Sequence, residues 1–482
     1  MMKENIKRLE KTARLLEPNE KQRKNIRAKV VTYTEYFLNN IETIKAFETK
    51  HKKGVGLLNS PISEKPLNIN KILDLVKKNV DTPALNPASG GHLGYIPGGG
   101  IYYAALGDYM ADITNRYAGL FFTSPGAVRM ENMLLKWMAN LAGYPESAVG
   151  NLTSGGSIAN LIAIVSAKKA HQIKSKNIEK TVVYLSEHAH HCIEKALRIA
   201  GLEECVKRFI PLDKNFRITP SALEKLISED RKKGLQPWLV IASAGTTDVG
   251  AVDPLDEISK IAKKNKLWYH IDAAYGGFFL LTKNGKEKLK GIEKSDSLVM
   301  DPHKGLFLPY GLGTVLVRNQ KAIKDAHYYQ ANYMQDALDC VDEPSPADLS
   351  PELTKHFRGF RMWLPLKLLG TKPFVAALEE KLALANYFYK EIQKIGFEVG
   401  NAPDLSVVTY RYIPRKGNAD AFNKALVEEV QKDGRVFISS TIINGNYTLR
   451  LAVLSFRTHL STVDMTLKIL KQKVKMLEEK ND

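Results

Sequence analysis

The chain has 482 residues, a formal net charge of +18 and 44% apolar residues. A chain of this length buries a sizeable core and usually forms two or three domains. It contains no run of about 18 uncharged apolar residues and no secretory signal, which argues against a membrane span and against export. Its three cysteines, Cys192, Cys205 and Cys340, are too few for a disulfide framework, so we expect a reducing cytoplasm.

The strong positive charge raises the possibility of a nucleic-acid or membrane partner. Much of the lysine lies in residues 3–29 and 468–475, interleaved with apolar and acidic residues, as in solvated helical faces. No zinc knuckle, aromatic RNA-binding signature or helix-turn-helix pattern is visible. We therefore expect neither nucleic acid nor membrane as a partner, and a non-catalytic basic binding protein remains a distant alternative.

Three regions follow from the pattern of elements. We expect a helical N-terminal segment over 1–100, a large domain over 101–370 and a small α+β domain over 371–482. Strands are predicted in the large domain at 182–185, 238–242, 267–272, 297–300 and 313–318, and helices between them. Asp253 and Pro254 are expected to start one of these helices as N-cap and first residue. The alternation predicts an α/β fold with a largely parallel sheet and function at the strand ends.

The small domain is expected to carry helices at 373–394, 418–433 and 461–478, with strands at 405–412 and 448–454.

A glycine-rich loop opens one helix of the large domain. Residues 150–157 read Gly-Asn-Leu-Thr-Ser-Gly-Gly-Ser, and apolar residues follow at 158, 161, 162 and 165, the spacing of a helix packed on a core. The backbone N–H groups of Gly156 and Ser157 could hold a phosphate there. The loop matches neither common nucleotide-binding motif, so nucleotides are disfavoured. An ordinary helix-capping loop is the alternative.

Three histidines, His188, His190 and His191, follow the strand 182–185. They lack the helical i, i+4 pair and a cysteine or acidic partner at ligand spacing, so we expect no metal site. An imidazole at a strand end can instead stack on a cofactor ring, and His190 is the best candidate.

A second strand ends in Asp272 within the run Tyr-His-Ile-Asp-Ala-Ala-Tyr-Gly-Gly at 269–277. Alternation along a strand places Asp272 and Ala274 on the same side. A carboxylate and a methyl group so placed suit a flat pyridinium ring, the first as partner of the ring nitrogen and the second as a thin floor. The alternative is a buried aspartate satisfied by turn amides.

The segment 301–305, Asp-Pro-His-Lys-Gly, follows the apolar run 297–300. Lys304 at the end of a buried strand would be partly desolvated and nucleophilic toward a carbonyl. His303 could donate to a phosphate or a carboxylate. A surface turn with a solvated lysine gives the same pattern.

These four motifs, in this order, resemble the pyridoxal-5′-phosphate-dependent group II amino-acid decarboxylases, which include aromatic amino-acid, histidine and glutamate decarboxylases. The resemblance covers roughly residues 80–460 and implies fold type I, with a mainly parallel seven-stranded sheet flanked by helices, and conversion of an L-amino acid to its amine and CO₂. It implies that Gly156 and Ser157 bind the phosphate of the cofactor and that His303 lies next to this phosphate. Around the ring, it implies that His190 stacks above, Ala274 lies beneath and Thr246 lies beside it. Asp272 would pair with the ring nitrogen, and Lys304 would form the Schiff base.

The resemblance also supplies a proton donor. Tyr333 matches a family tyrosine, carried on a lid, that protonates the carbanion left by CO₂, and the stretch 329–352 has the composition of a lid. Tyr328 and Tyr329 are alternatives in the loop, and His190 is another possible donor. Tyrosine at this position, where aldehyde-forming members have phenylalanine, favours simple decarboxylation.

The substrate side departs from the family pattern. Tyr95, Ile96 and Gly98 align with a segment in which an aromatic residue and a threonine flank the proline, and Ile96 and Gly98 replace them. Gly119 falls where aromatic-acid decarboxylases carry a bulky aromatic residue from the partner subunit. Both changes predict an enlarged pocket and argue against a small aromatic substrate.

Arg450 matches a family arginine near the cofactor and substrate, and strand alternation would turn it toward a polar surface. A plain salt bridge is the alternative.

The partners implied are a small amino-acid substrate and a second copy of the chain. In the expected homodimer, residues 117–125 and the lid complete the partner's pocket. Another pyridoxal-phosphate-dependent lyase or an aldehyde synthase is the nearer alternative function.

Overall fold

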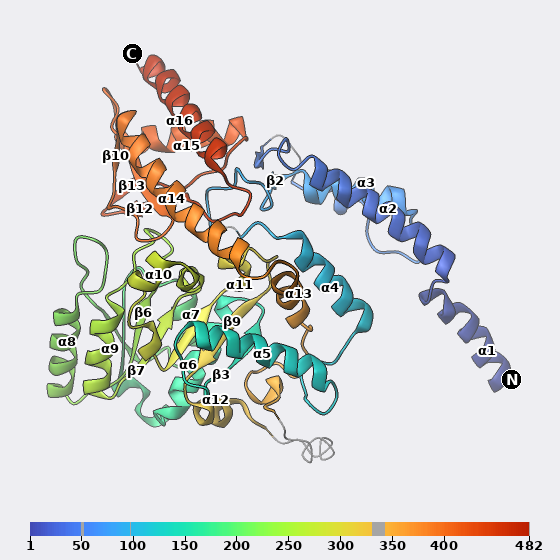
Figure 1. The fold of residues 1–482 in the computed structure, drawn as a ribbon, viewed down its shortest axis with the longest axis horizontal. Helices are drawn as coiled ribbons and strands as arrows, with labels where there is room; N and C mark the ends of the chain where they lie inside the picture. Colours follow the sequence, from blue (N-terminus) through green and yellow to red (C-terminus); the bar gives the residue numbers. More distant parts are fainter. Residues whose placement is uncertain (50–52, 97, 330–342, 482) are drawn as a thin grey trace.

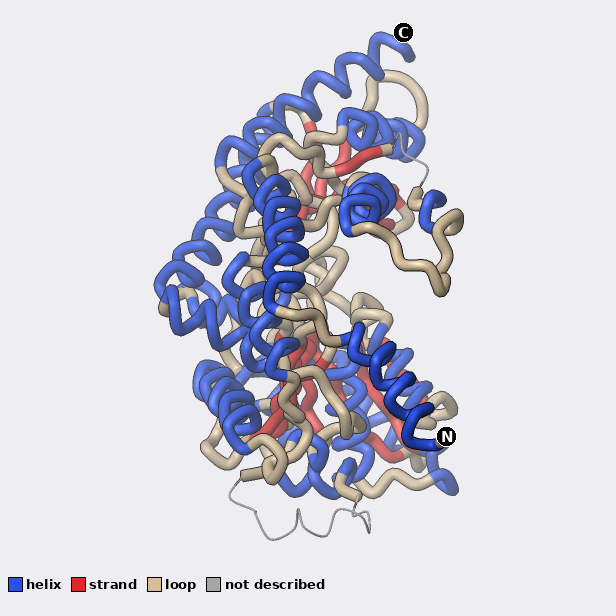
Figure 2. Tube along the Cα trace, turned by 90° about the vertical axis from the view of Figure 1, so that its right-hand side faces the viewer, coloured by secondary structure: helices blue, strands red, loops and turns tan. Residues whose placement is uncertain are grey.

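The computed structural model describes residues 1–49, 53–96, 98–329 and 343–481. Figure 1 shows a large α/β body, a smaller C-terminal region on one end of it, and an N-terminal helical arm that projects from the side. In Figure 2 the strands gather in two separate places, one for each sheet. No helix in the described ranges is long and apolar enough to cross a membrane.

The large body is built on a seven-stranded sheet of order β3-β9-β8-β7-β6-β4-β5. Its strands are β3 (Val149–Thr153), β4 (Thr181–Leu185), β5 (Val206–Phe209), β6 (Gln236–Ser243), β7 (Trp268–Asp272), β8 (Ser297–Met300) and β9 (Gly313–Val317). All neighbours pair in parallel except β9, which is antiparallel to both β3 and β8. The predicted fold class is therefore confirmed. The carboxyl ends of the parallel strands meet at one edge of the sheet.

Helices cover both faces of this sheet. They are α5 (Pro125–Leu141), α6 (Gly156–Ala170), α7 (Cys192–Ile199), α8 (Pro220–Lys232), α9 (Leu255–Asn265), α10 (Lys283–Lys288), α11 (Pro302–Gly305), α12 (Gln320–His327) and α13 (Gly359–Leu369). Short 3₁₀ turns lie at Arg14–Leu16, Val55–Leu57, Ser175–Lys180, Gly277–Leu281, Ile292–Lys294 and Pro346–Asp348, and a π turn at Lys77–Asp81.

Helix α6 buries a different face from the one predicted. Of the four apolar positions in the pattern only Ile162 is buried, whereas the alanines at 159, 163 and 167 are fully buried. Small side chains at i, i+4 and i+8 let the helix lie close against the sheet. This close approach brings the N-terminus of α6 to the strand ends.

Asp253 does not cap α9, contrary to the sequence prediction. The helix begins at Leu255, and the Asp253 carboxylate accepts the backbone N–H groups of Ile218 (2.8 Å) and Ser243 (2.7 Å). Burial raises its pKa to about 6, against the opposing effect of these two N–H groups. Asp253 therefore ties the end of β6 to the loop before α8.

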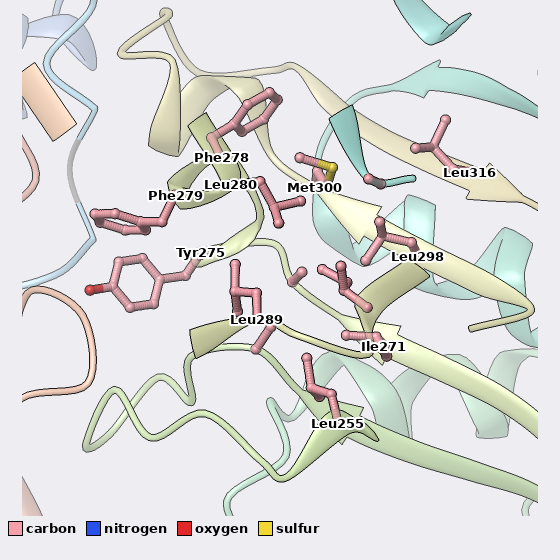
Figure 3. Close-up of a cluster of buried hydrophobic side chains, with 14 of the residues drawn as sticks. Leu255, Ile271, Tyr275, Phe278, Phe279, Leu280, Leu289, Leu298, Met300 and Leu316 are labelled. Atoms are coloured by element: carbon pink, nitrogen blue, oxygen red, sulfur yellow. The ribbon is translucent and has the colours of Figure 1, made fainter. Parts of the chain in front are cut away.

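Alternate residues of the sheet enter two separate cores. Leu298 and Met300 point into one apolar cluster, whereas Val299 between them enters the cluster on the opposite face. Figure 3 shows part of the first cluster, where Tyr275, Phe278 and Phe279 pack beside the strand residues. Near-continuous apolar strands are typical of a sheet covered on both faces.

The C-terminal region has its own antiparallel sheet and core. Its strands are β10 (Phe397–Val399), β11 (Val407–Tyr412), β12 (Ser439–Ile443) and β13 (Asn446–Ala452), in the order β10-β11-β13-β12. Its helices are α14 (Lys372–Lys394), α15 (Ala419–Asp433) and α16 (Leu460–Asn481). An N-terminal segment joins this region, because Leu93 exchanges backbone hydrogen bonds with Phe437 and Ala452, both 2.8 Å long.

The N-terminal arm consists of α1 (Met2–Ala13), α2 (Glu20–Asn39) and α3 (Ile69–Val76), with the short pair β1 (Phe47–Glu48) and β2 (Ala84–Leu85). None of the three helices buries a residue within its own chain. Helix α4 (Tyr102–Thr114), which follows, is buried only through Ala104, Gly107 and Ala111. The arm thus presents apolar side chains to solvent in this single copy.

Candidate active site

A cavity of about 360 Å³ opens at the carboxyl ends of the parallel strands. All eight residues predicted to bind the cofactor line it, namely Gly156, Ser157, His190, Thr246, Asp272, Ala274, His303 and Lys304. They come from the N-terminus of α6, the loop after β4, the loop after β6, the end of β7 and the helix α11 after β8. Parallel strands explain why motifs so distant in sequence meet here.

The N-terminus of α6 forms one end of the cavity. A side chain on Gly156 would place its Cβ 2.8 Å from Asp301 Oδ2 and 3.3 Å from the Ala274 methyl, so the backbone is accessible only because the residue is glycine. The first amides of a helix have no partner within it, and the helix dipole is positive there. This end suits an anion such as a phosphate.

Lys304 lies deep in the cavity, with its Nζ 3.1 Å from Asp301 Oδ2. Burial alone would lower the pKa of Lys304, but the carboxylates of Asp301 and Asp272 outweigh it and hold the pKa above its ordinary value. The predicted desolvation of the amine is present, but the two acids offset it and stabilise the ammonium form. The nucleophilic role of Lys304 stays a prediction.

Asp272 is held by one turn amide and one side chain. Its Oδ1 accepts the backbone N–H of Ala274 at 3.0 Å, and its Oδ2 accepts Asn160 Nδ2 at 3.2 Å. Strand β7 ends at Asp272, so the turn rather than strand alternation brings Ala274 beside it. The remaining lone pairs of the carboxylate are available to a cationic ring nitrogen.

Burial lowers the pKa of both His190 and His303, so both rings are neutral near pH 7. His190 Nδ1 accepts the backbone N–H of Cys192 at 3.2 Å, which leaves its proton on Nε2. His303 donates from Nδ1 to the Leu312 carbonyl at 2.6 Å, which leaves Nε2 as an acceptor. The neutral His303 therefore cannot donate to a phosphate as the sequence suggested; it must first be protonated.

Thr246 is buried at the rim, and its Oγ1 accepts the backbone N–H of Ala251 at 3.1 Å.

The five predicted substrate residues, Tyr95, Ile96, Gly98, Gly119 and Arg450, do not line this cavity. A Cβ on Gly98 would lie 2.1 Å from the His303 carbonyl oxygen, and one on Gly119 would lie 2.1 Å from the Leu353 carbonyl oxygen. These carbonyl oxygens leave no room for a side chain at either position, so both glycines are required by close packing within this single copy. The enlarged pocket stays a prediction.

Arg450 does not reach a polar surface. Its side chain is buried, and Nη1 donates to the Gly94 carbonyl and to Ser439 Oγ (3.2 Å). Its Nε and Nη2 are buried and have no partner among the described residues. The predicted alternation is nevertheless present, because Leu449 and Leu451 enter the opposite, apolar core.

Tyr95, beside Gly94, is 57% exposed and contacts the rings of His92 and Phe437. Ile96 is partly buried against the main core.

Among the lining residues that sequence reasoning did not assign are Asn160, Cys192, Asp301 and Tyr310. Asn160 lies four residues after Gly156, and a polar residue on an otherwise apolar helix face was a signal that could have identified it. Asp301 is buried, and its Oδ1 has no partner among the described residues. Tyr310 is not marked by any local pattern, because its place depends on the turn after α11.

Tyr333 lies outside the described residues. Tyr328 and Tyr329 are exposed and do not line the cavity. The end of the expected lid is tied down, since Ala347 N–H donates to the Gly119 carbonyl (3.0 Å) and Ser345 Oγ accepts the Phe121 N–H (3.0 Å).

The fold and the set of residues at the strand ends define a pyridoxal-phosphate enzyme of fold type I. The family model described as the pyridoxal-dependent decarboxylase conserved domain matches residues 50–413, and the chain belongs to this family.

The chain is similar to several characterised decarboxylases. It is 33% identical to the aromatic-L-amino-acid decarboxylase of Bacillus atrophaeus over 88% of both chains. It is 27% identical to tryptophan decarboxylase 2 of Oryza sativa subsp. japonica, over 89% of this chain and 90% of the other. The structure of Oryza sativa TDC with PLP and tryptamine has the same fold, with a TM-score of 0.90, 22% identity and coverage of 96% of this chain and 99% of that one.

The chain is accordingly a pyridoxal-phosphate-dependent amino-acid decarboxylase. Its cavity fits the cofactor on its own geometry. Asp272 has carboxylate lone pairs for a ring nitrogen, Gly156 leaves the α6 terminus open for a phosphate, and Lys304 is the lysine that lines the wall.

Proposed function

We propose that Lys304, Asp272 and His190 carry out this decarboxylation, and that the substrates are aromatic L-amino acids. The observation that supports the assignment is that all three side chains face one cavity, whose far end is the open N-terminus of α6. Pyridoxal phosphate supplies a ring that accepts the electrons of the broken Cα–carboxylate bond.

Each residue has a role that follows from its surroundings. Asp272 keeps a proton on the ring nitrogen by charge pairing. Lys304 would hold the cofactor through its aldehyde carbon until the amino group of the substrate replaces it, and the amides of Gly156 and Ser157 would hold the phosphate. Ala274 provides a flat floor, and Thr246 and His303 border the ring and the phosphate.

The proton that replaces CO₂ at Cα comes, in this proposal, from Tyr333. His190 is the second possible donor, because its neutral ring carries a proton on Nε2. A positioned acid of this kind contributes about 10²–10⁴-fold to a rate.

Close packing accounts for Gly98 and Gly119 without reference to the size of the substrate, which supports keeping aromatic substrates in this proposal. The two relatives described above, named for aromatic L-amino acids and for tryptophan, point to the same substrate class. The test is a panel of aromatic, acidic and aliphatic L-amino acids, assayed for CO₂ and amine. Turnover of acidic amino acids alone would contradict the substrate proposal, and ammonia with peroxide would indicate an aldehyde synthase.

The lysine assignment has a direct test. Borohydride reduction of the loaded protein followed by peptide mapping should place the cofactor on Lys304, and Lys304→Ala should lose both the label and turnover. Label on Lys263 or Lys355 would overturn the assignment. Retained unfolding temperature in Lys304→Ala would show that the fold is intact.

We also propose that the active unit is a cytoplasmic homodimer. The support is the arm α1–α3, which buries no residue of its own chain, and the exposed apolar face of α4, which includes Tyr109, Met110 and Ile113. Exposed apolar side chains gathered in one region usually mark a protein–protein interface.

A further inference from the structure

A continuous line of buried polar side chains runs from Asp272 and Asn160 in the cavity wall into the interior of the sheet. Trp268 Nε1 donates to Ser297 Oγ at 2.8 Å, and Ser297 Oγ lies 2.8 Å from His270 Nδ1. His270 Nε2 lies 2.7 Å from Asn160 Oδ1, and Asn160 Nδ2 donates to Asp272 Oδ2 at 3.2 Å. The four side chains other than Asp272 are nine-tenths or more buried.

The Asp272 carboxylate sets the direction of these bonds, because a carboxylate only accepts. Asn160 turns its amide nitrogen toward Asp272, and Cys192 Sγ, 3.5 Å from this nitrogen, is its second acceptor. Asn160 Oδ1 therefore faces His270 Nε2, which must carry a proton to donate, and the neutral ring then has a bare Nδ1. Ser297 Oγ accepts from Trp268 Nε1, since an indole N–H only donates, and its own proton is free to donate to the bare Nδ1.

His270 is neutral, as this direction requires. Burial lowers its pKa to about 4, although the nearby Asp272 carboxylate and the backbone of Ser297 act in the opposite sense. The groups that face the ring are Ser297 from β8, Asn160 from α6 and, as a nearby charge, Asp272 from its own strand. The ring therefore stays neutral near pH 7, and its bonds to Asn160 and Ser297 select the tautomer with the proton on Nε2.

We propose that Trp268, Ser297, His270 and Asn160 form a one-way hydrogen-bond line that orients the Asp272 carboxylate for pairing with the cofactor ring. They are positioning residues, and the inference rests on the proposed role of Asp272. A flipped Asn160 would set its carbonyl oxygen against Asp272 Oδ2 and its N–H groups against His270 Nε2–H. Both contacts would be repulsive, so the flip is disfavoured at two points as long as His270 keeps its tautomer.

The tautomer of His270 tests the line in the unaltered protein. Nitrogen-15 NMR of histidine-labelled holoenzyme, with the signal assigned by its loss in His270→Gln, should show protonated Nε2 and bare Nδ1 between pH 6 and 9. A protonated Nδ1, or a ring charged at pH 7, would overturn the proposal without any variant having to fold.

Ser297→Ala removes the hydroxyl that donates to His270 Nδ1 and so favours the tautomer with the proton on Nε2. Since a hydrogen bond to a charged group is worth about 1.5–3 kcal/mol, we expect the dissociation constant of pyridoxal phosphate to rise roughly tenfold or more. We expect kcat to fall by a similar factor with KM nearly unchanged, because Asp272 acts on the cofactor and not on the substrate. The Nε2 signature of His270 should be lost.

Ser295→Ala is the matched control. Ser295 is also fully buried and lies two residues earlier, but it bonds to Tyr144 (2.6 Å) and to the Ile292 carbonyl (2.8 Å), outside the line. If Ser297→Ala and Ser295→Ala have equal cofactor affinity and equal kcat, the proposal is contradicted. Asp272→Asn distinguishes failure of the line from failure of the proposed role of Asp272. Full activity in Asp272→Asn would refute the role of Asp272 itself. Loss of activity in Asp272→Asn together with unchanged activity in Ser297→Ala would refute the line alone.

Discussion

Lys304 is held as an ammonium ion by Asp301 and Asp272, and this has a kinetic consequence for loading. Only the neutral amine attacks an aldehyde. Because the acids raise the pKa of Lys304 against the effect of burial, the neutral fraction at pH 7 is smaller than for an ordinary lysine, and loading should accelerate as pH rises.

Asp301→Asn should remove one of these acids and lower the pKa of Lys304. The rate of pyridoxal-phosphate loading, followed by absorbance at several pH values, should then rise several-fold at pH 7, and its pH profile should move to lower pH. Asp325→Asn, at an exposed ion pair, is the control and should leave the profile in place. An unchanged profile in Asp301→Asn would show that the Asp301–Lys304 contact does not govern loading.

Tyr333→Phe tests the proposed proton donor. It keeps the aromatic ring and removes the O–H, so amine formation should fall by roughly 10²-fold with little change in KM, while carbonyl product and peroxide increase. Tyr328→Phe and Tyr329→Phe are the controls. If one of these controls loses amine formation and Tyr333→Phe does not, the position of the donor in the loop is wrong.

The sequence was informative at residues that directly follow strands and less so elsewhere. Asp272 and Lys304 could be placed because the ends of parallel strands must meet. The close packing at Gly98 and Gly119 could not be predicted, because the carbonyl groups of His303 and Leu353 that leave no room for a side chain come from distant segments. The state of Lys304 was missed for the same reason, since it depends on two acids that only the fold brings near it.

At the scale of elements, residues 98–100 support the lysine helix α11 through the close approach of Gly98 to the His303 carbonyl. Gly98→Ala should force the two backbones apart, lower the unfolding temperature and reduce cofactor loading at least tenfold. Gly126→Ala is the matched control, because a Cβ there has no atom within 4 Å and lies in α5, where alanine is favoured by about 1 kcal/mol. Similar behaviour of the two variants would contradict the supporting role of the loop.

Elements with a strong apolar pattern were predicted within a few residues, and the differences have tertiary causes. The Asp-Pro pair at 253–254 has the local chemistry of a helix start, but the two backbone N–H groups that Asp253 accepts take precedence. Strand β12 was not predicted, because its residues are half-exposed and lack the apolar run that marked the central strands. Helix α6 was predicted, but the burial of its alanine face was not, because that burial depends on how closely the helix approaches the sheet.

At the scale of the whole molecule, the exposed apolar arm predicts a dimer that a charged substitution in the arm would weaken. Ile26, Val30 and Val31 of α2 are exposed in the single copy. Val30→Glu should raise the dimer dissociation constant at least tenfold, measured by sedimentation, and activity should fall in parallel at low protein concentration. Ile413→Glu, at an exposed apolar residue of the C-terminal region, should change neither. A fully active monomer of the unaltered chain would refute the dimer.

Ala88, Gly90 and Gly99 owe their position to the far end of the chain. Arg457 donates to the carbonyls of Ala88 (3.0 Å) and Gly99 (2.8 Å), and Thr458 donates to the Gly90 carbonyl (2.6 Å). These partners are more than 350 residues apart, so a ribosome must complete almost the whole protein before they can meet. Contacts so distant in sequence form late in folding. The loop that supports Lys304 is therefore among the last parts to settle, and a nascent chain has all its cofactor-binding motifs well before it can become an enzyme.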